Sequence, residues 1–232
     1  MKIYLFVAML SICSMCANAQ KKTGTEQSPI YMMPDGTIIS KDKIDSVSKA
    51  WNGAIFIGKE DKDKDKGVLH LIRLSDSEMK QINEKNAKDE LVLKGLIGKP
   101  AADFDLIDMR GKHWSLKALR GKVVVLNFWY TSCPPCLQEM PKLNEITGLY
   151  SADKVVFLAL TFNEREKVKQ FLQLHKFNYI ILPGSKTVDQ QYGITGWPTS
   201  LVIDKKGKIS AALNISEDIK QDLVSAIDKN LH

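Results

Sequence analysis

Residues 123–136 read Val-Val-Val-Leu-Asn-Phe-Trp-Tyr-Thr-Ser-Cys-Pro-Pro-Cys, an apolar run followed by two cysteines with two prolines between them. A nearly continuous apolar run is typical of a strand that is covered on both faces of its sheet. Proline is tolerated in the first turn of a helix, so we expect a helix to begin near Pro134. The stretch therefore predicts a buried strand that leads into a helix with a cysteine at its start.

The same alternation of strands and helices continues to the end of the chain. The other predicted strands are residues 155–161, 179–182, 201–203 and 208–212. The predicted helices are residues 134–150, 163–175, 186–192 and 216–230. In the second helix, Asn163 is expected to be the N-cap, with Glu166 three residues later. The order predicts an α/β fold over residues 96–232, with a mixed sheet and helices on both faces.

Residues 20–95 predict a separate, smaller α/β unit of unknown role. A turn at Pro34-Asp35-Gly36 separates two short apolar runs, which predicts a hairpin. Two further strands are expected at residues 54–57 and 68–74, and a helix at residues 40–51. The pattern Ser-x-x-Glu at Ser75 is typical of a capping box, so a helix should follow it.

Residues 1–19 have the form of a secretory signal peptide. A basic residue at position 2 precedes a short apolar run that ends in Ala17-Asn18-Ala19, which predicts cleavage after Ala19 and export to the periplasm. The run is too short for a comfortable membrane span, which needs about 20 apolar residues. Lipid anchoring at Cys13 or Cys16 is less favoured, because each follows a large residue instead of a small one.

The composition excludes several classes of protein. The 232 residues are 44% hydrophobic and 26% charged, which does not fit a disordered, collagen-like or multi-span membrane chain. The formal net charge is +6, but the basic residues are interspersed with acids. Because no basic stripe interleaved with aromatic residues is present, we expect no nucleic-acid partner.

Cleavage of the signal would leave only Cys133 and Cys136 of the four cysteines. A disulfide between them closes a very short loop and constrains the unfolded chain little, so an inert staple is the weaker interpretation. The four histidines are scattered, so we expect no metal site and no cofactor. A thiolate at the start of a helix is stabilised by unpaired N–H groups and the helix dipole. Such a pair suits thiol–disulfide exchange, in which one thiol attacks and the second resolves.

These motifs together resemble the thioredoxin superfamily, and more closely its exported TlpA/ResA-like branch. The matching residues are 125–129, Cys133 to Cys136, Glu139, Pro141, 192–199, 201–204 and Gly207. The resemblance covers about residues 96–232 and does not extend to residues 28–95.

The resemblance implies roles for two cysteines and a carboxylate. Cys133 would be the exposed nucleophile and Cys136 the resolving thiol of a redox disulfide. Glu139 would accept or relay a proton near the inner cysteine. The alternative for Glu139 is an ordinary solvated residue on a helix face.

The resemblance also implies a substrate-binding loop. Pro198 matches the cis-proline that faces the disulfide in this superfamily, which would leave the neighbouring backbone free to pair with an extended client. Trp197, Gly196 and Thr195 would line the docking groove. The alternative is an ordinary loop with a packed tryptophan.

Two positions depart from the superfamily pattern. Asn127 stands where cytosolic thioredoxins carry a buried Asp, which makes Glu139 more interesting as a proton acceptor. Ser132 stands where the family usually has Trp, so the large planar side chain that would lie beside the nucleophile is absent. Trp129 is expected to be a packed aromatic residue.

The sequence thus predicts an exported protein disulfide oxidoreductase that acts as a reductase. The resemblance implies a disulfide-bearing client protein and an upstream dithiol electron donor, with a membrane relay as the family's expectation. One alternative is a redox-inactive chaperone, or a thiol-based metal or haem carrier, on the same scaffold. A peroxidase is disfavoured, because Tyr130 stands where such enzymes place a Thr three residues before the attacking cysteine.

Overall fold

The computed structural model describes residues 29–58, 67–214, 216 and 218–231. The expected signal peptide and residues 20–27 therefore lie outside the described residues. The chain divides into two compact units, Met1–Asp76 and Ser77–His232. This division falls earlier than residue 95, where the sequence suggested it, because the long helix α2 (Asp76–Leu96) belongs by its contacts to the second unit. Within the described ranges, no helix is both long and apolar enough to cross a membrane.

In its described residues, 29–58 and 67–76, the first unit is a small sheet accompanied by the α-helix α1. Its elements are β1 (Ile30–Met32), β2 (Ile38–Ile39), a 3-10 turn (Lys41–Lys43), α1 (Ile44–Ala50), β3 (Ile55–Gly58) and β4 (Val68–Arg73). The strand order is β2-β1-β4-β3, with β1 parallel to β4 and the other pairs antiparallel. The expected turn between β1 and β2 is present, where the backbone N–H of Thr37 donates to Asp35 Oδ1 at 2.9 Å.

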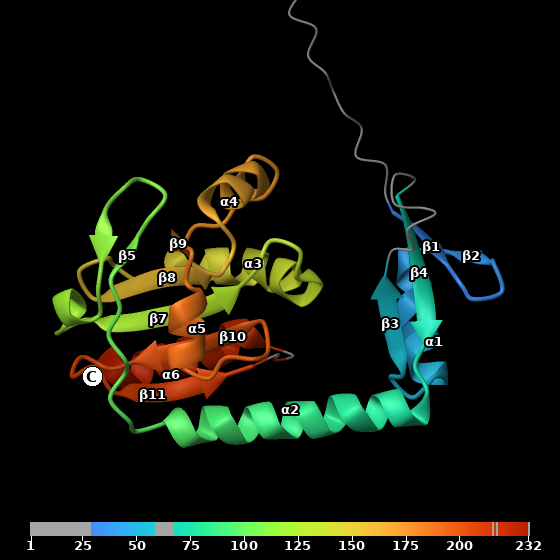
Figure 1. The fold of residues 1–232 in the computed structure, drawn as a ribbon, viewed down its shortest axis with the longest axis horizontal. Coiled ribbons are helices and arrows are strands. Elements are labelled where there is room, and N and C mark those ends of the chain that lie inside the picture. Colours follow the sequence, from blue (N-terminus) through green and yellow to red (C-terminus); the bar gives the residue numbers. More distant parts are fainter. Residues whose placement is uncertain (1–28, 59–66, 215, 217, 232) are drawn as a thin grey trace, which may run out of the picture. The chain divides into compact units, whose positions relative to one another are not determined.

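The second unit is built on a five-stranded mixed sheet (Figure 1). Its strands are β7 (Val123–Trp129), β8 (Val155–Thr161), β9 (Ile180–Pro183), β10 (Thr199–Ile203) and β11 (Ile209–Leu213). The order is β11-β10-β7-β8-β9, with β7, β8 and β9 parallel and the two C-terminal strands antiparallel. A short hairpin of β5 (Leu106–Ile107) and β6 (His113–Trp114) precedes this sheet in the chain. The expected α/β fold with a mixed sheet is confirmed.

The central strand β7 is buried along its whole length because it separates two apolar cores. Val123 and Val125 point into one core, and the intervening Val124 and Leu126 point into the other. Side chains of a strand alternate between faces, so a strand covered on both sides must be apolar at nearly every position. The one polar exception on β7 is Asn127, which is also buried.

Helices cover both faces of this sheet. Helices α3 (Pro134–Thr147), α4 (Arg165–Leu172) and α6 (Ile219–Leu231) supply side chains to the first core, and α3 and α6 contact each other. Helices α2 and α5 (Lys186–Gln191) supply Leu93 and Val188 to the second core. The strand β7 and the helix α3 are joined by residues 130–133, so the cysteine pair lies at the carboxyl end of the central strand.

Candidate active site

Cys133 and Cys136 form a disulfide at the start of α3, with their Cα atoms 5.3 Å apart. Cys133 occupies the N-cap position, and its Sγ accepts a hydrogen bond from the backbone N–H of Cys136 at 3.2 Å. The first N–H groups of a helix lack partners within the helix, and the dipole places partial positive charge there. A negatively charged sulfur at Cys133 is therefore stabilised by the backbone of α3 after reduction.

The expectation that Cys133 is exposed is wrong for this disulfide form. Cys133 is 1% exposed and Cys136 is 2% exposed, and both belong to the first apolar core. The disulfide bond keeps the sulfur of Cys133 next to the buried sulfur of Cys136. The adjacent residues Ser132 and Pro134 are exposed, so the pair lies just beneath the surface.

Trp197 packs against the core that holds the disulfide and also against the second core. The peptide bond between Trp197 and Pro198 is cis, as the resemblance implied, and Pro198 is buried. The half-buried Trp197 forms an aromatic cluster with Tyr130 and Phe162, with ring centroids 5.4 to 5.7 Å apart. The structure thus brings Trp197 and the cysteine pair to one part of the molecule, while Trp129 is packed inside the core as expected.

Thr195 and Gly196, the other two expected docking residues, have polar groups that are already engaged. Thr195 is exposed, and both its hydroxyl and its carbonyl contact side chains of α2. The carbonyl of Gly196 accepts a hydrogen bond from Thr199 Oγ1 at 2.9 Å. These contacts fix the loop that leads into Pro198.

Glu139 is a buried carboxyl on the helix face of the inner cysteine. Residues three apart on a helix are neighbours, so Glu139 lies on the same side of α3 as Cys136. Burial raises the pKa of Glu139 to about 7, although the charge of Lys142 opposes the shift. The side chain also faces Tyr179, whose pKa is raised by burial and further by the charge of Glu139. The solvated alternative for Glu139 does not hold, because the residue is 8% exposed.

Asn127 and Asn163 hold neighbouring parts of the site in place. The Asn127 side chain donates to Ser200 Oγ at 3.1 Å, so this amide joins β7 to β10. Asn163 was predicted as the N-cap of α4, which is wrong, because Glu164 occupies that position. The Asn163 side-chain oxygen instead accepts the backbone N–H of Thr131 at 2.7 Å, two residues before Cys133. Only its place directly after a buried strand could have indicated this role.

Asp189 on α5 is a second buried carboxyl that the sequence analysis missed. Its Oδ1 accepts a hydrogen bond from Ser185 Oγ at 2.8 Å, and burial raises its pKa to about 6. The indole N–H of Trp197 interacts with this carboxyl and lowers its pKa, opposing the effect of burial. Neither Asp189 Oδ2 nor Trp197 Nε1 has a partner that meets the geometry of a direct hydrogen bond. Asp189 thus lies close to the indole of Trp197, the residue that precedes Pro198.

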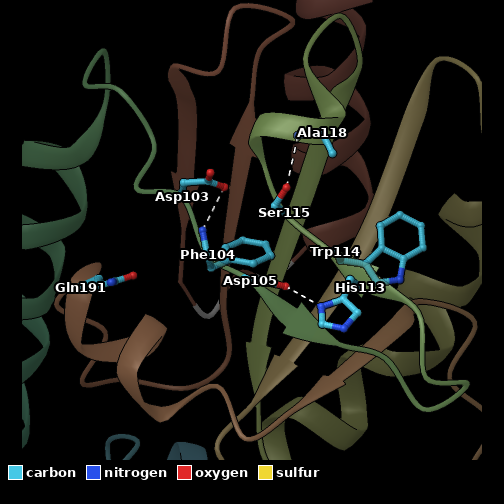
Figure 2. Close-up of a pocket in the computed structure, with 8 residues that line it drawn as sticks. All are labelled: Asp103, Phe104, Asp105, His113, Trp114, Ser115, Ala118 and Gln191. Carbon is cyan, nitrogen blue, oxygen red and sulfur yellow. Dashed lines mark hydrogen bonds and ion pairs between the residues drawn. The ribbon is translucent and has the colours of Figure 1, made fainter.

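A surface hollow of about 690 Å³ lies at the β5–β6 hairpin, and Gln191 of α5 also lines it (Figure 2). Its lining includes His113, whose Nδ1 lies 2.9 Å from Asp105 Oδ1, and both side chains are exposed. Neither cysteine nor any residue of the Trp197 turn lines it. Among the residues that the structure describes, no group of three or more His, Cys, Asp or Glu side chains could hold a metal ion.

Comparison with known proteins gives consistent relatives for the second unit. Residues 97–212, half of the chain, match the AhpC/TSA family. The chain is 40% identical over 136 residues to a Bacillus anthracis protein named thiol-disulfide oxidoreductase ResA, covering 57% of this chain and 78% of the relative. It is 33% identical over 135 residues to the thioredoxin-like protein YneN of Bacillus subtilis, covering 56% and 78%.

Solved structures give the same result for the fold. A thiol:disulfide interchange protein of the thioredoxin family from Chlorobium tepidum TLS superimposes with a TM-score of 0.52 at 27% identity. The superposition covers 58% of this chain and 97% of that protein. Together with the family match, this likeness leads to one conclusion: the chain belongs to the AhpC/TSA family, and its second unit has a thioredoxin-like fold.

Proposed function

We propose that the protein is a thiol–disulfide oxidoreductase that reduces disulfides of client polypeptides with the Cys133–Cys136 pair. The observation that supports this most directly is the position of the pair, with Cys133 as the N-cap of α3 and Trp197 packed on the same core. Relatives named thiol-disulfide oxidoreductase add support, because the chain spans 78% of their length.

The proposed reaction has two exchange steps. The Cys133 thiolate attacks one sulfur of the client disulfide, so a mixed disulfide forms and the client's other sulfur leaves as a thiolate. The Cys136 thiolate then attacks the sulfur of Cys133, which releases the second client sulfur and closes the Cys133–Cys136 disulfide. The client gains two electrons and two protons, and the protein loses the same. An upstream dithiol donor would restore the reduced pair by the reverse exchange.

Glu139 is proposed as the proton acceptor for the second step. The Cys136 thiol must lose its proton before it can attack, and Glu139 lies one helical turn away on the same side of α3. Because burial raises the pKa of Glu139 to about 7, both its protonated and its ionised form are present near neutral pH. A carboxyl with such a pKa can accept and return a proton without a large free-energy cost in either direction.

A reductase assay with matched variants tests the proposal. The reduced protein is mixed with a disulfide-containing reporter protein, and newly formed reporter thiols are counted. Cys133→Ser should abolish turnover, whereas Cys136→Ala should accumulate a mixed disulfide through Cys133 that is visible on a non-reducing gel. Ser132→Ala, on the exposed neighbour of Cys133, is the control and should retain turnover. Unchanged turnover in Cys133→Ser would remove the proposed nucleophile. Consumption of hydrogen peroxide by the reduced protein would instead favour a peroxidase.

The burial of both cysteines favours a second candidate, a redox-inactive protein with a structural disulfide. At 1% and 2% exposure, the sulfurs are less accessible than a reactive pair is expected to be. Equilibration of the pair with glutathione separates the two functions. Structural disulfides have reduction potentials below about −300 mV, whereas a working exchange pair equilibrates within the range of thioredoxin-like enzymes. The same titration in the presence of copper or haem would reveal a carrier.

Export is proposed from residues 1–19, with the periplasm as the destination. The basic start, the apolar run and the Ala17-Asn18-Ala19 end support it. The mass of the mature protein, purified after expression of the full chain, checks the proposal. A chain that begins at Gln20 is expected, and a lipid-modified cysteine at position 13 or 16, or an uncleaved amino terminus, would contradict cleavage after Ala19.

A further inference from the structure

Helix α2 makes a close polar contact with the loop that leads into the Trp197-Pro198 turn. Thr195 Oγ1 donates a hydrogen bond to Asp89 Oδ1 at 2.5 Å. Lys85 Nζ lies 2.5 Å from Asp89 Oδ2 and donates a second hydrogen bond to the carbonyl oxygen of Thr195 at 3.0 Å. The three residues form a closed polar triangle that uses both the side chain and the backbone of Thr195.

The carboxylate of Asp89 is held ionised at the centre of this triangle. Burial alone would raise the pKa of Asp89, since its side chain is 10% exposed. The hydrogen bonds from Lys85 and Thr195, together with the positive charges of Lys85 and Lys88, outweigh this effect and hold the pKa of Asp89 below its usual value. Hydrogen bonds to a charged group are stronger than neutral ones, and a buried charge requires its partners. The triangle is therefore expected to resist opening more than a surface ion pair would.

Close backbone approach at two glycines and apolar packing beyond Asp89 also bring α2 near the loop. A Cβ atom added to Gly196 would lie 3.0 Å from Asp89 Oδ2, and one added to Gly193 would lie 3.3 Å from Val92 Cγ1. Leu93, one turn beyond Asp89, is buried in the second core together with Ile194. Positions 85, 89 and 93 are spaced by four residues, so they form one stripe along α2 that faces the loop.

From these contacts we infer that Lys85 and Asp89 are positioning residues that set the conformation of the client-docking loop and thereby the affinity for polypeptide disulfides. The inference rests on the proposed function. Residues 97–212 match the family, whereas the triangle draws two of its three residues from α2, before that range. The hydroxyl and the carbonyl of Thr195 are already paired with α2. The loop that contains Thr195 and Gly196, which we call the docking loop, is therefore ordered before a client binds, and binding does not have to offset the entropy of ordering it.

The test compares Asp89→Ala with Glu90→Ala in the full protein. Glu90 is the next residue on α2, is exposed, and pairs with Lys94 at 2.6 Å, so its loss removes a similar charge away from the loop. Asp89→Ala is expected to raise KM for a disulfide-bearing peptide by about tenfold or more, because hydrogen bonds to a charged group are lost. We expect kcat, and the equilibrium constant of the Cys133–Cys136 pair with glutathione, to stay within twofold of the wild type. Glu90→Ala should match the wild type in all three.

Two further measurements keep the test decisive. Reduction of a small, flexible disulfide compound needs no docking loop, so Asp89→Ala should retain it, which also shows that the variant is folded. Asp89→Asn keeps an acceptor for Thr195 but loses the charge that holds Lys85, so its KM should lie between those of the wild type and Asp89→Ala. Equal KM values for Asp89→Ala and Glu90→Ala, or a parallel loss of peptide and small-disulfide turnover, would overturn the inference. Failure of the wild type to reduce any peptide disulfide would overturn the proposed function itself.

Discussion

Replacing Glu139 with glutamine should remove a loss of stability that the wild type suffers as the pH rises. Glu139 is 8% exposed, and its pKa is raised from 4.5 to about 7 by burial. The native state therefore holds a proton that the unfolded chain releases near pH 4.5. Between about pH 4.5 and 7 the unfolded state binds fewer protons than the native state, so the free energy of unfolding falls as the pH rises.

The size of this effect follows from the difference between the two pKa values. Each pKa unit corresponds to 1.36 kcal/mol, so a rise from 4.5 to about 7 corresponds to about 3 kcal/mol. The full penalty is present above pH 7 and vanishes below about pH 4.5. Glutamine has nearly the same volume and does not titrate in this range. The difference in unfolding free energy between Glu139→Gln and the wild type should therefore grow by about 2 to 3 kcal/mol from pH 4.5 to 8.

Urea unfolding of the oxidised protein at several pH values between 4.5 and 8 provides the measurement. Other titrating groups affect both proteins equally, so the difference between the two curves isolates Glu139. Glu145→Gln is the control, since Glu145 lies on the same helix but is exposed and pairs with Lys220. A difference between Glu139→Gln and wild type that stays constant over this pH range would refute the assignment of a buried, protonated carboxyl. If Glu139 accepts the proton of Cys136 as proposed, the same variant should also lose the pH dependence near 7 of the second exchange step in the reductase assay.

Two further substitutions test the surroundings of the site. Asp189→Asn should stabilise the protein above pH 6 by up to about 3 kcal/mol relative to the wild type, because burial raises the pKa of Asp189 from 3.8 to about 6. The gain should fade as the pH falls through 6 toward 3.8 in urea unfolding, and a gain that does not depend on pH would contradict it. Asn163→Ala removes the acceptor of the Thr131 N–H and should cost about 1 to 3 kcal/mol in the same experiment. No loss of stability in Asn163→Ala would show that this contact does not hold the loop before Cys133.

Much of the thioredoxin-like fold could be predicted because its decisive signals are local. A buried strand such as β8 needs an unbroken apolar run, and the predicted residues 155–161 match its bounds. The start of α3 at Pro134 follows from the fixed backbone angle of proline. Nothing in the local sequence requires the cis bond before Pro198. It was expected only from the resemblance to the superfamily.

The burial of the cysteines and the role of Asn163 could not be read from the sequence for a physical reason. A capping pattern of Asn163 and Glu166 competes with a tertiary hydrogen bond to Thr131, and the tertiary contact prevails. The exposure of Cys133 depends on side chains that reach the site from separate segments. Trp197 and Cys133 are packed on one core although 64 residues separate them in the chain.

The contact between α2 and Thr195 could not be predicted from the sequence either, and it involves residues that lie before the range matched by the family. Asp89 and Thr195 are 106 residues apart, and nothing in either neighbourhood marks them as partners. A Lys and an Asp four residues apart on a helix are usually a solvated pair that contributes little to stability. Here the Asp is buried because Gly196 allows the loop to approach, and the Lys reaches the loop backbone. A comparison restricted to residues 97–212 would therefore omit Lys85 and Asp89 on α2, whose contacts with Thr195 support the proposed positioning role.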